Sequence, residues 1–110
     1  MILIKLLFIC SKNQWRSPTA EKIFHLYEGH QARSAGTESG ARIKVTEGHI
    51  GWADIIFVME KKHLRRIREK FGILLNHKTV VNLDIADDYQ YMDEELIEIL
   101  QNRVLEQIEK

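Results

Sequence analysis

A cysteine and an arginine six residues apart, Cys10 and Arg16, are the residues whose types and spacing first suggest chemistry in this chain. A thiolate is a strong nucleophile, and a guanidinium offers two parallel donors to the oxygens of a phosphate-like group. The backbone N–H groups of a short loop between them can converge on an anion. Ser17, directly after the arginine, can donate its hydroxyl to the thiolate. The pattern predicts a nucleophile that accepts a phosphoryl group inside its own anion-binding loop.

The segments that flank this loop predict how it is held. Residues 2–9 are almost continuously apolar and rich in Ile and Leu, which is typical of a buried strand in a parallel sheet. After the loop, Ser17 suits the cap of a helix, Pro18 its first position and Gly29 its end. The N-terminus of that helix would face the loop and favour both a thiolate and a bound anion. Cys10 could also be an ordinary buried residue at a strand end, but these flanks favour the chemical interpretation.

A second catalytic group is needed to put a proton on the oxygen that leaves phosphorus. A carboxylic acid on a nearby loop can supply this proton and then activate the attacking water. Three acids follow the last predicted strand, Asp84, Asp87 and Asp88. Asp84 fits the end of that strand, so Asp87 and Asp88 are the candidates for the acid. Tyr89 and Tyr91 are expected to flank the mouth of the pocket, where aromatic rings can stack on a phenyl group.

The rest of the chain alternates between strand and helix patterns, which indicates one three-layer α/β domain over residues 1–110. Further strands are expected at 31–35, 54–59 and 78–83, and further helices at 46–52, 60–71 and 93–107. We expect a parallel four-stranded sheet in the order 2-1-3-4 with helices on both faces. The phosphate loop would then lie at the carboxyl end of the first strand, near the switch in strand order, where ligands bind in such sheets.

The amino-acid composition indicates which binding partners to expect and whether the protein resides in a reducing compartment. Sixteen basic residues balance sixteen acidic ones, which gives no long-range attraction to nucleic acid or to a membrane. The basic side chains of the 60–71 helix are interpreted as a solvated face. A single cysteine excludes an internal disulfide and suits a reducing compartment, so we expect a cytoplasmic protein. The spacings of the histidines fit no metal site, and no cofactor is expected.

Residues 10–21 resemble the phosphate-binding loop of the low-molecular-weight protein tyrosine phosphatases. Three later stretches, 34–37, 54–60 and 87–89, resemble the same family in the same order. The region between Thr37 and Thr46 is much shorter than in the family, and the chain looks most like its short bacterial members. The resemblance implies a phosphomonoester hydrolase that works through a cysteinyl-phosphate, with phosphotyrosine in a protein as the leading substrate.

The resemblance also implies roles for individual residues. Cys10 would be the nucleophile and Arg16 a catalytic phosphate ligand. Asp87 would be the general acid, because residues 87–89 align with the family's Asp-Pro-Tyr. The residues of the phosphate site would be Ser11, Lys12, Asn13, Gln14, Trp15, Arg16 and Ser17.

Supporting residues follow from the same alignment. Ser34 would hold Asn13, whose backbone we expect in the left-handed region that asparagine tolerates, although Ser34 could equally be an ordinary turn serine. Asp88 stands where the family has proline, which removes a restraint on the backbone and leaves open that Asp88 is the acid. Tyr89 would complete the loop that carries the acid.

Two other functions stay open at this point. A non-catalytic phosphate- or phosphopeptide-binding module would fit the shortened region at 37–44 and the presence of Asp88. An arsenate reductase of this fold would need an external thiol, because Cys10 is the one cysteine of the chain. Lys12 and Trp15 replace a glycine and a cysteine of the family and alter the pocket.

Expected partners are a phosphorylated protein or a small aryl phosphate, with inorganic phosphate or another oxyanion in the loop. We expect no binding to nucleic acid or to a membrane, and a monomer or weak dimer in solution.

Overall fold

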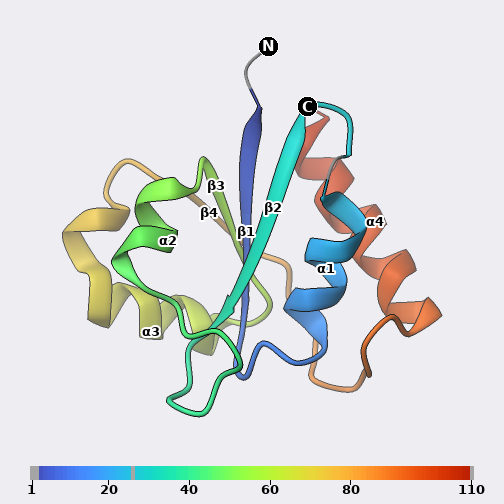
Figure 1. Ribbon diagram of the computed structural model, residues 1–110, viewed down its shortest axis with the longest axis horizontal. Helices are drawn as coiled ribbons and strands as arrows, with labels where there is room; N and C mark the ends of the chain where they lie inside the picture. The colour runs from blue at the N-terminus through green and yellow to red at the C-terminus, as the bar shows by residue number, and fades with distance from the viewer. Residues whose placement is uncertain (1–2, 26, 110) are drawn as a thin grey trace.

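Four parallel strands form one sheet in the order β2-β1-β3-β4 in a computed structural model that describes residues 3–25 and 27–109 (Figure 1). The strands are β1 (Ile4–Cys10), β2 (His30–Gly36), β3 (Ile55–Val58) and β4 (Thr79–Asn82). The predicted fold class and strand order are therefore confirmed. Each strand lies within one or two residues of its predicted bounds, because the apolar runs that mark the strands are also the segments that are buried.

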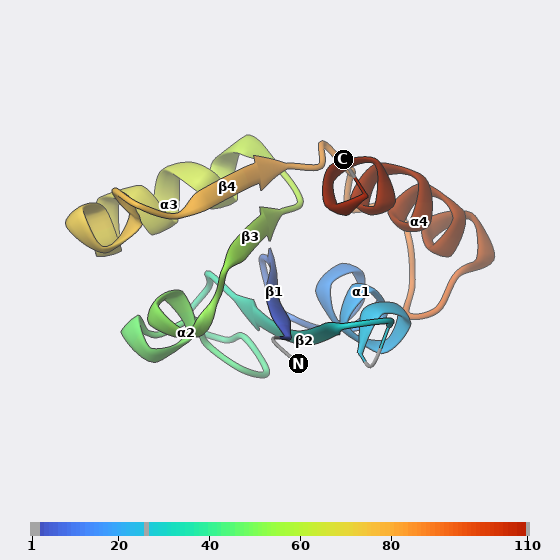
Figure 2. The ribbon, with the colours of Figure 1, turned by 90° about the horizontal axis from the view of Figure 1, so that it is seen from above.

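Helices cover both faces of the sheet. They are α1 (Arg16–Phe24), α2 (Glu47–Trp52), α3 (Lys61–Phe71), the short 3-10 helix η1 (Gly72–Leu75) and α4 (Glu94–Ile108). Figure 2 shows α1 and α4 on one side of the sheet and α2 and α3 on the other. All four α-helices were predicted from the sequence, whereas η1 was not. No helix in the described ranges is long and apolar enough to cross a membrane.

Side chains of β1 alternate between two hydrophobic cores. Phe8 points toward α1 and α4, where its ring stacks between Phe24 and Phe57 at centroid distances of 5.7 and 5.2 Å. Ile9 points to the opposite core, against α2 and α3. Cys10 ends the strand on the Phe8 side and is 3% exposed. A strand buried on both faces fixes the start of the loop that follows it.

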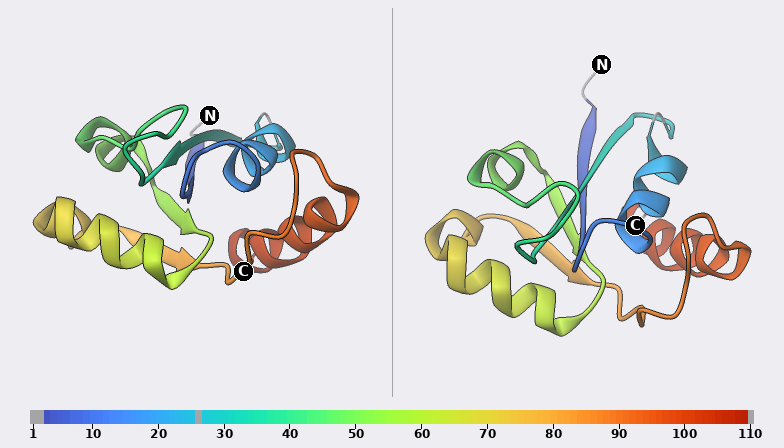
Figure 3. Two further views of the ribbon diagram at one scale, coloured as in Figure 1. Left: turned by 90° about the horizontal axis from the view of Figure 1, so that it is seen from below. Right: turned by 60° about the horizontal axis from the view of Figure 1, so that its bottom comes forward.

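The start of α1 differs from the prediction. The helix begins at Arg16, and Trp15 at its cap position makes no side-chain capping bond. Ser17 lies inside the first turn, is fully buried and bonds to Cys10 instead of capping the helix. The helix ends at Phe24 rather than at Gly29, which has a φ of +76° and lies in the turn before β2. Figure 3 shows the loops after β1, β2 and β4 gathered at the carboxyl ends of the strands.

Candidate active site

The loop of residues 11–15 is held from outside by the segment that follows β2. Four consecutive carbonyls, those of residues 10–13, accept hydrogen bonds from this segment. The donors are Thr37 N to Cys10 O (3.0 Å), Glu38 N to Ser11 O (3.0 Å), Arg42 N to Lys12 O (2.9 Å) and Arg42 Nε to Asn13 O (3.0 Å). In a trans peptide the carbonyl and the next N–H point in opposite directions. The N–H groups of residues 11–14 are therefore turned away from this segment.

A cavity of about 290 Å³ lies beside this loop. Its lining residues are Cys10, Ser11, Lys12, Gln14, Trp15, Arg16 and Asp87. The cavity therefore joins the predicted nucleophile, the predicted phosphate ligand and the predicted acid. The shortened region at 37–44 is the part of the chain that orients the loop, so its reduced length has not removed that support.

Two backbone features allow the loop to pack this closely. Asn13 has a φ of +56°, as expected from the sequence. Gly36, the last residue of β2, lies so close to the loop that a Cβ atom there would be 2.6 Å from the carbonyl oxygen of Ser11 and 2.7 Å from the Cβ of Ala41. Contact at this distance is forbidden to any other residue, so the loop requires glycine at position 36.

The thiol of Cys10 is held by a short hydrogen-bond chain. Its Sγ lies 2.9 Å from the Oγ of Ser17, and the Nδ2 of Asn13 donates to the same Oγ at 2.8 Å. Because Ser17 accepts from Asn13, its own proton is free to point at the sulfur. Ser17 can therefore stabilise a thiolate when Cys10 is unprotonated and also when it is a leaving group.

Arg16 is 2% exposed and connects the loops that follow β3 and β4 to the phosphate loop. Its Nη1 donates to the Oε2 of Glu60 at 2.6 Å and to the carbonyl of Ile85 at 2.8 Å. Burial opposes the ionisation of Glu60, but the hydrogen bond and the positive charge of Arg16 outweigh it, so the pKa of Glu60 lies below its usual value. The guanidinium is thus fixed by an ionised carboxylate and a carbonyl while it lines the cavity.

His63 is a site residue that the sequence analysis did not identify. Its Nε2 lies 2.8 Å from the Oγ of Ser11, and its Nδ1 accepts the backbone N–H of Glu60 at 3.0 Å. Since Nδ1 accepts, the proton of a neutral ring is on Nε2, which donates to Ser11. Burial, followed by the charge of Arg16, lowers the pKa of His63 to about 4. The ring is therefore neutral near pH 7.

The loop that carries the predicted acid agrees with the prediction for Asp87 but differs from it for Tyr89. Asp87 lines the cavity, with its Oδ1 3.5 Å from the Nε of Arg16, whereas Asp88 is exposed and is not among the lining residues. Tyr89 was expected at the mouth of the pocket but packs against the core beside α1 and α4. Burial of its apolar ring accounts for this position. Tyr91, two residues later, is exposed and lines a neighbouring groove together with Trp15.

Ser34 also has a different partner from the one expected. Its hydroxyl donates to the carboxylate of Glu21 on α1, and Asn13 bonds to Ser17 instead. A carboxylate is a stronger acceptor than an amide oxygen, and the packing of α1 beside β2 brings it within reach. As a result the Oδ1 of Asn13 is buried without a hydrogen-bond partner among the described residues.

The fold and the site together define a class. A cysteine and an arginine share an oxyanion-binding loop at the carboxyl end of β1, as a phosphatase with a cysteine nucleophile requires. Residues 5–50, which include this loop, match the family model described as low molecular weight phosphotyrosine protein phosphatase. The predicted resemblance to this family is therefore confirmed over these residues, which carry the loop from Cys10 to Arg16.

Solved structures show the same fold over almost the whole chain. The YwlE arginine phosphatase from Geobacillus stearothermophilus is 21% identical, with a TM-score of 0.75 over 96% of this chain and 93% of its own. The tyrosine phosphatase Wzb from Escherichia coli K30, solved in complex with phosphate, is 24% identical, with a TM-score of 0.77 over 99% and 92%. YfkJ from Bacillus subtilis is 20% identical, with a TM-score of 0.72 over 99% and 96%. A search of curated protein sequences gave no match.

Proposed function

We propose that this protein is a phosphoric monoester hydrolase that acts on phosphotyrosine in proteins, with Cys10 as the nucleophile and Asp87 as the general acid. The observation that carries the proposal is the shared cavity. Cys10, Arg16 and Asp87 border one space together with Ser11, Lys12 and Gln14 of the loop. This set brings a nucleophile, an oxyanion site and a proton donor to one cavity.

In the first step the thiolate of Cys10 attacks phosphorus as the bond from phosphorus to the phenolic oxygen breaks. The loop N–H groups and Arg16 stabilise the charge on the three non-bridging oxygens. Asp87 gives its proton to the leaving oxygen. In the second step Asp87 takes a proton from water, the water oxygen bonds to phosphorus, and Cys10 leaves as a thiolate that accepts a hydrogen bond from the hydroxyl of Ser17.

An aryl substrate is supported by the walls of the site. Trp15 borders the cavity and is 44% exposed, so its ring is available to a phenyl group. Phosphoarginine is the competing substrate, because YwlE of the same fold is named an arginine phosphatase. The described part of the cavity lining includes one carboxylate, Asp87, which Arg16 already faces. This leaves no second anion to pair with a substrate guanidinium and favours the aryl ester.

A reducing compartment such as the cytoplasm suits this nucleophile. Many cysteine nucleophiles are protected from over-oxidation by forming a disulfide with a second cysteine. Cys10 is the one cysteine of the chain, so no internal disulfide can form. The same count opposes arsenate reduction without an external thiol.

Hydrolysis of an aryl phosphate by the purified protein, with and without vanadate, tests the proposal. We expect turnover that vanadate inhibits competitively, and higher kcat/KM for a phosphotyrosine peptide than for a phosphoarginine peptide. Cys10→Ser should abolish turnover and still bind inorganic phosphate, because the loop and Arg16 remain. Phosphate binding by the wild-type protein without any turnover would instead support a binding module. A preference for phosphoarginine would overturn the substrate assignment alone.

A further inference from the structure

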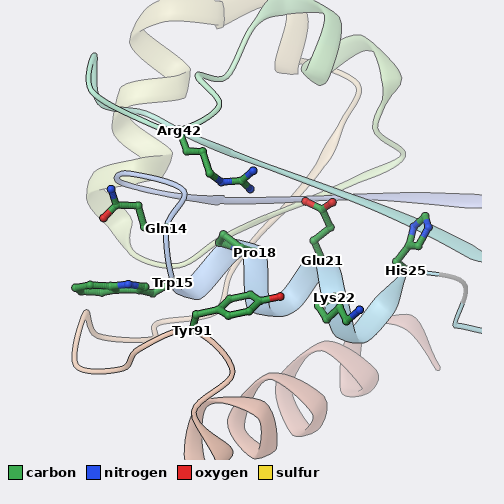
Figure 4. A pocket seen from close by; sticks show the side chains of 8 residues that line it. All are labelled: Gln14, Trp15, Pro18, Glu21, Lys22, His25, Arg42 and Tyr91. Atoms are coloured by element: carbon green, nitrogen blue, oxygen red, sulfur yellow. The ribbon is translucent and has the colours of Figure 1, made fainter.

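A groove of about 470 Å³ runs along α1 beside the catalytic cavity (Figure 4). Gln14 and Trp15 line both the groove and the cavity, so the two spaces share a wall. A phosphoryl group and its phenyl ring would occupy the cavity. The groove extends farther, past Pro18 to His25 near the end of α1, and lies where the rest of a larger substrate would pass.

The groove is predominantly basic. Lys22, His25 and Arg42 border it, against one acid, Glu21, whose carboxylate already accepts the hydroxyl of Ser34. Neither Lys22 nor Arg42 forms a salt bridge with any residue in the described ranges. Arg42 uses its Nε to hold the carbonyl of Asn13, and Figure 4 shows its guanidinium directed over the groove. Basic groups without a carboxylate partner beside a groove attract an acidic ligand.

Two aromatic side chains also border the groove. Trp15 and Tyr91 are 44% and 51% exposed, and Figure 4 shows their rings lying along the same edge with Pro18 behind them. Large exposed aromatic side chains beside a catalytic cavity are typical of surfaces that bind a polypeptide, because they give much contact area for little loss of conformational entropy. A small phosphate ester seated in the cavity would not reach Tyr91, which is not part of the cavity lining.

We propose that this groove binds the polypeptide next to the phosphorylated residue and selects substrates with Asp or Glu there. Lys22 and Arg42, which both border the groove, would attract the acidic side chain, while Trp15 and Tyr91 would pack on the adjoining backbone and side chains. The proposal rests on the proposed function, because it assumes a phosphorylated polypeptide in the catalytic cavity. It adds a specificity for sequence that the phosphoryl-transfer residues do not provide.

The test compares kcat/KM for three substrates: a phosphotyrosine peptide with acidic flanks, the same peptide with the acids replaced by their amides, and a small aryl phosphate. The variants are Lys22→Glu and Tyr91→Ala. The matched control is Lys70→Glu, the same charge change on an exposed residue of α3, on the opposite side of the sheet. Acidic residues should be placed before and after the phosphotyrosine in separate peptides, so that either direction of binding is detected.

We expect the wild-type protein to prefer the acidic peptide over its amide by roughly tenfold, and Lys22→Glu to remove most of that preference. Tyr91→Ala should lower kcat/KM about equally for both peptides. Neither variant should change kcat/KM for the aryl phosphate more than about twofold, since neither residue lines the cavity. Equal rates on acidic and amide peptides, or the same effect from Lys70→Glu, would overturn the inference. Absence of aryl phosphate hydrolysis would overturn the proposed function itself.

Discussion

The Nε2 of His63 lies 2.8 Å from the Oγ of Ser11, so a buried histidine of α3 holds the first side chain of the phosphate loop across 52 residues of sequence. The Nδ1 of the same ring accepts the N–H of Glu60, whose carboxylate binds Arg16. One neutral imidazole therefore connects the two sides of the oxyanion site. Protonation of His63 would place a proton on its Nδ1 and break the hydrogen bond that the backbone N–H of Glu60 donates to this atom.

His63 should make stability depend on pH in a definite window. Its pKa is lowered by burial to about 4 in the folded protein and returns to its ordinary value of 6.5 on unfolding. Between these values the unfolded chain binds a proton that the folded chain excludes. The free energy of unfolding is then highest above pH 6.5 and falls by at most about 3 kcal/mol as the pH drops toward 4. Urea denaturation at several pH values across this window measures the loss.

His63→Gln is the matched variant, because glutamine can still donate to Ser11 and does not titrate. It should be less stable than the wild-type protein near neutral pH, and the difference between the two should shrink as the pH falls. Glu60, with its lowered pKa, loses its contribution at lower pH than His63 and so does not produce this change. Parallel pH curves for the two proteins would mean that His63 titrates normally.

Gly36→Ala should damage the loop from the side of β2. The added Cβ would meet the carbonyl oxygen of Ser11 at 2.6 Å, and backbone atoms cannot move aside as a flexible side chain can. We expect a loss of roughly 1–3 kcal/mol in stability, as for other overpacked sites, and at least a tenfold drop in kcat/KM through the displaced loop. Gly40→Ala, in the same segment with no atom within 4 Å of the added Cβ, is the control. Wild-type kinetics for Gly36→Ala would show that the loop tolerates the shift.

The fold and the core of the site could be predicted from the sequence because they depend on local patterns. β1 and β3 are apolar runs buried on both faces, and the loop between Cys10 and Arg16 is identified by its spacing and its flanks. Because β1 and β4 run parallel in this sheet, the loop after β1 and the acid of the β4–α4 connection both lie at the carboxyl ends of the strands. These steps need only the order of strands and helices along the chain.

The hydrogen-bond and packing partners of individual side chains could not be predicted in the same way. They depend on which side chains are brought together by elements that are distant in the sequence. Ser34 bonds to Glu21 because α1 packs beside β2, and Tyr89 is partly buried because the core beside α4 offers its ring apolar contacts. His63 did leave a signal in the sequence. It follows Glu60 by three residues at the start of a helix, the spacing of a capping box.

Arg16→Lys should be severely damaging although the charge is kept. Lysine can approach Glu60, but its single ammonium cannot also replace the donor to the carbonyl of Ile85 and the planar fork that faces the cavity. We expect kcat/KM for an aryl phosphate to fall about a hundredfold or more, the usual cost of losing a preorganised oxyanion donor. Arg68→Lys makes the same exchange at an exposed position of α3 and should leave the kinetics unchanged. Near-normal turnover by Arg16→Lys would show that Arg16 does not bind the phosphoryl group.

Asp87→Asn identifies the acid through the dependence of rate on the leaving group. Phenols with high pKa values need a proton as they leave phosphorus, whereas very acidic phenols do not. Asp87 lines the cavity, so Asp87→Asn should slow the transfer from esters of weakly acidic phenols by roughly a hundredfold or more and affect the others less. Because the same carboxylate activates water, a burst of phenol followed by slow turnover is expected with the acidic phenols. Pre-steady-state rates across a series of phenols measure both steps.

Asp88→Asn is the control for this series, because Asp88 is exposed and is not among the residues that line the cavity. It removes one negative charge from the same loop, so any general electrostatic effect on the phosphoryl group should appear in both variants alike. A change in the leaving-group dependence confined to Asp87→Asn would therefore come from proton transfer. The reverse result, with the loss confined to Asp88→Asn, would transfer the acid's role to Asp88. It would also require the β4–α4 loop to rearrange when substrate binds, because Asp87 is the residue that lies beside Arg16.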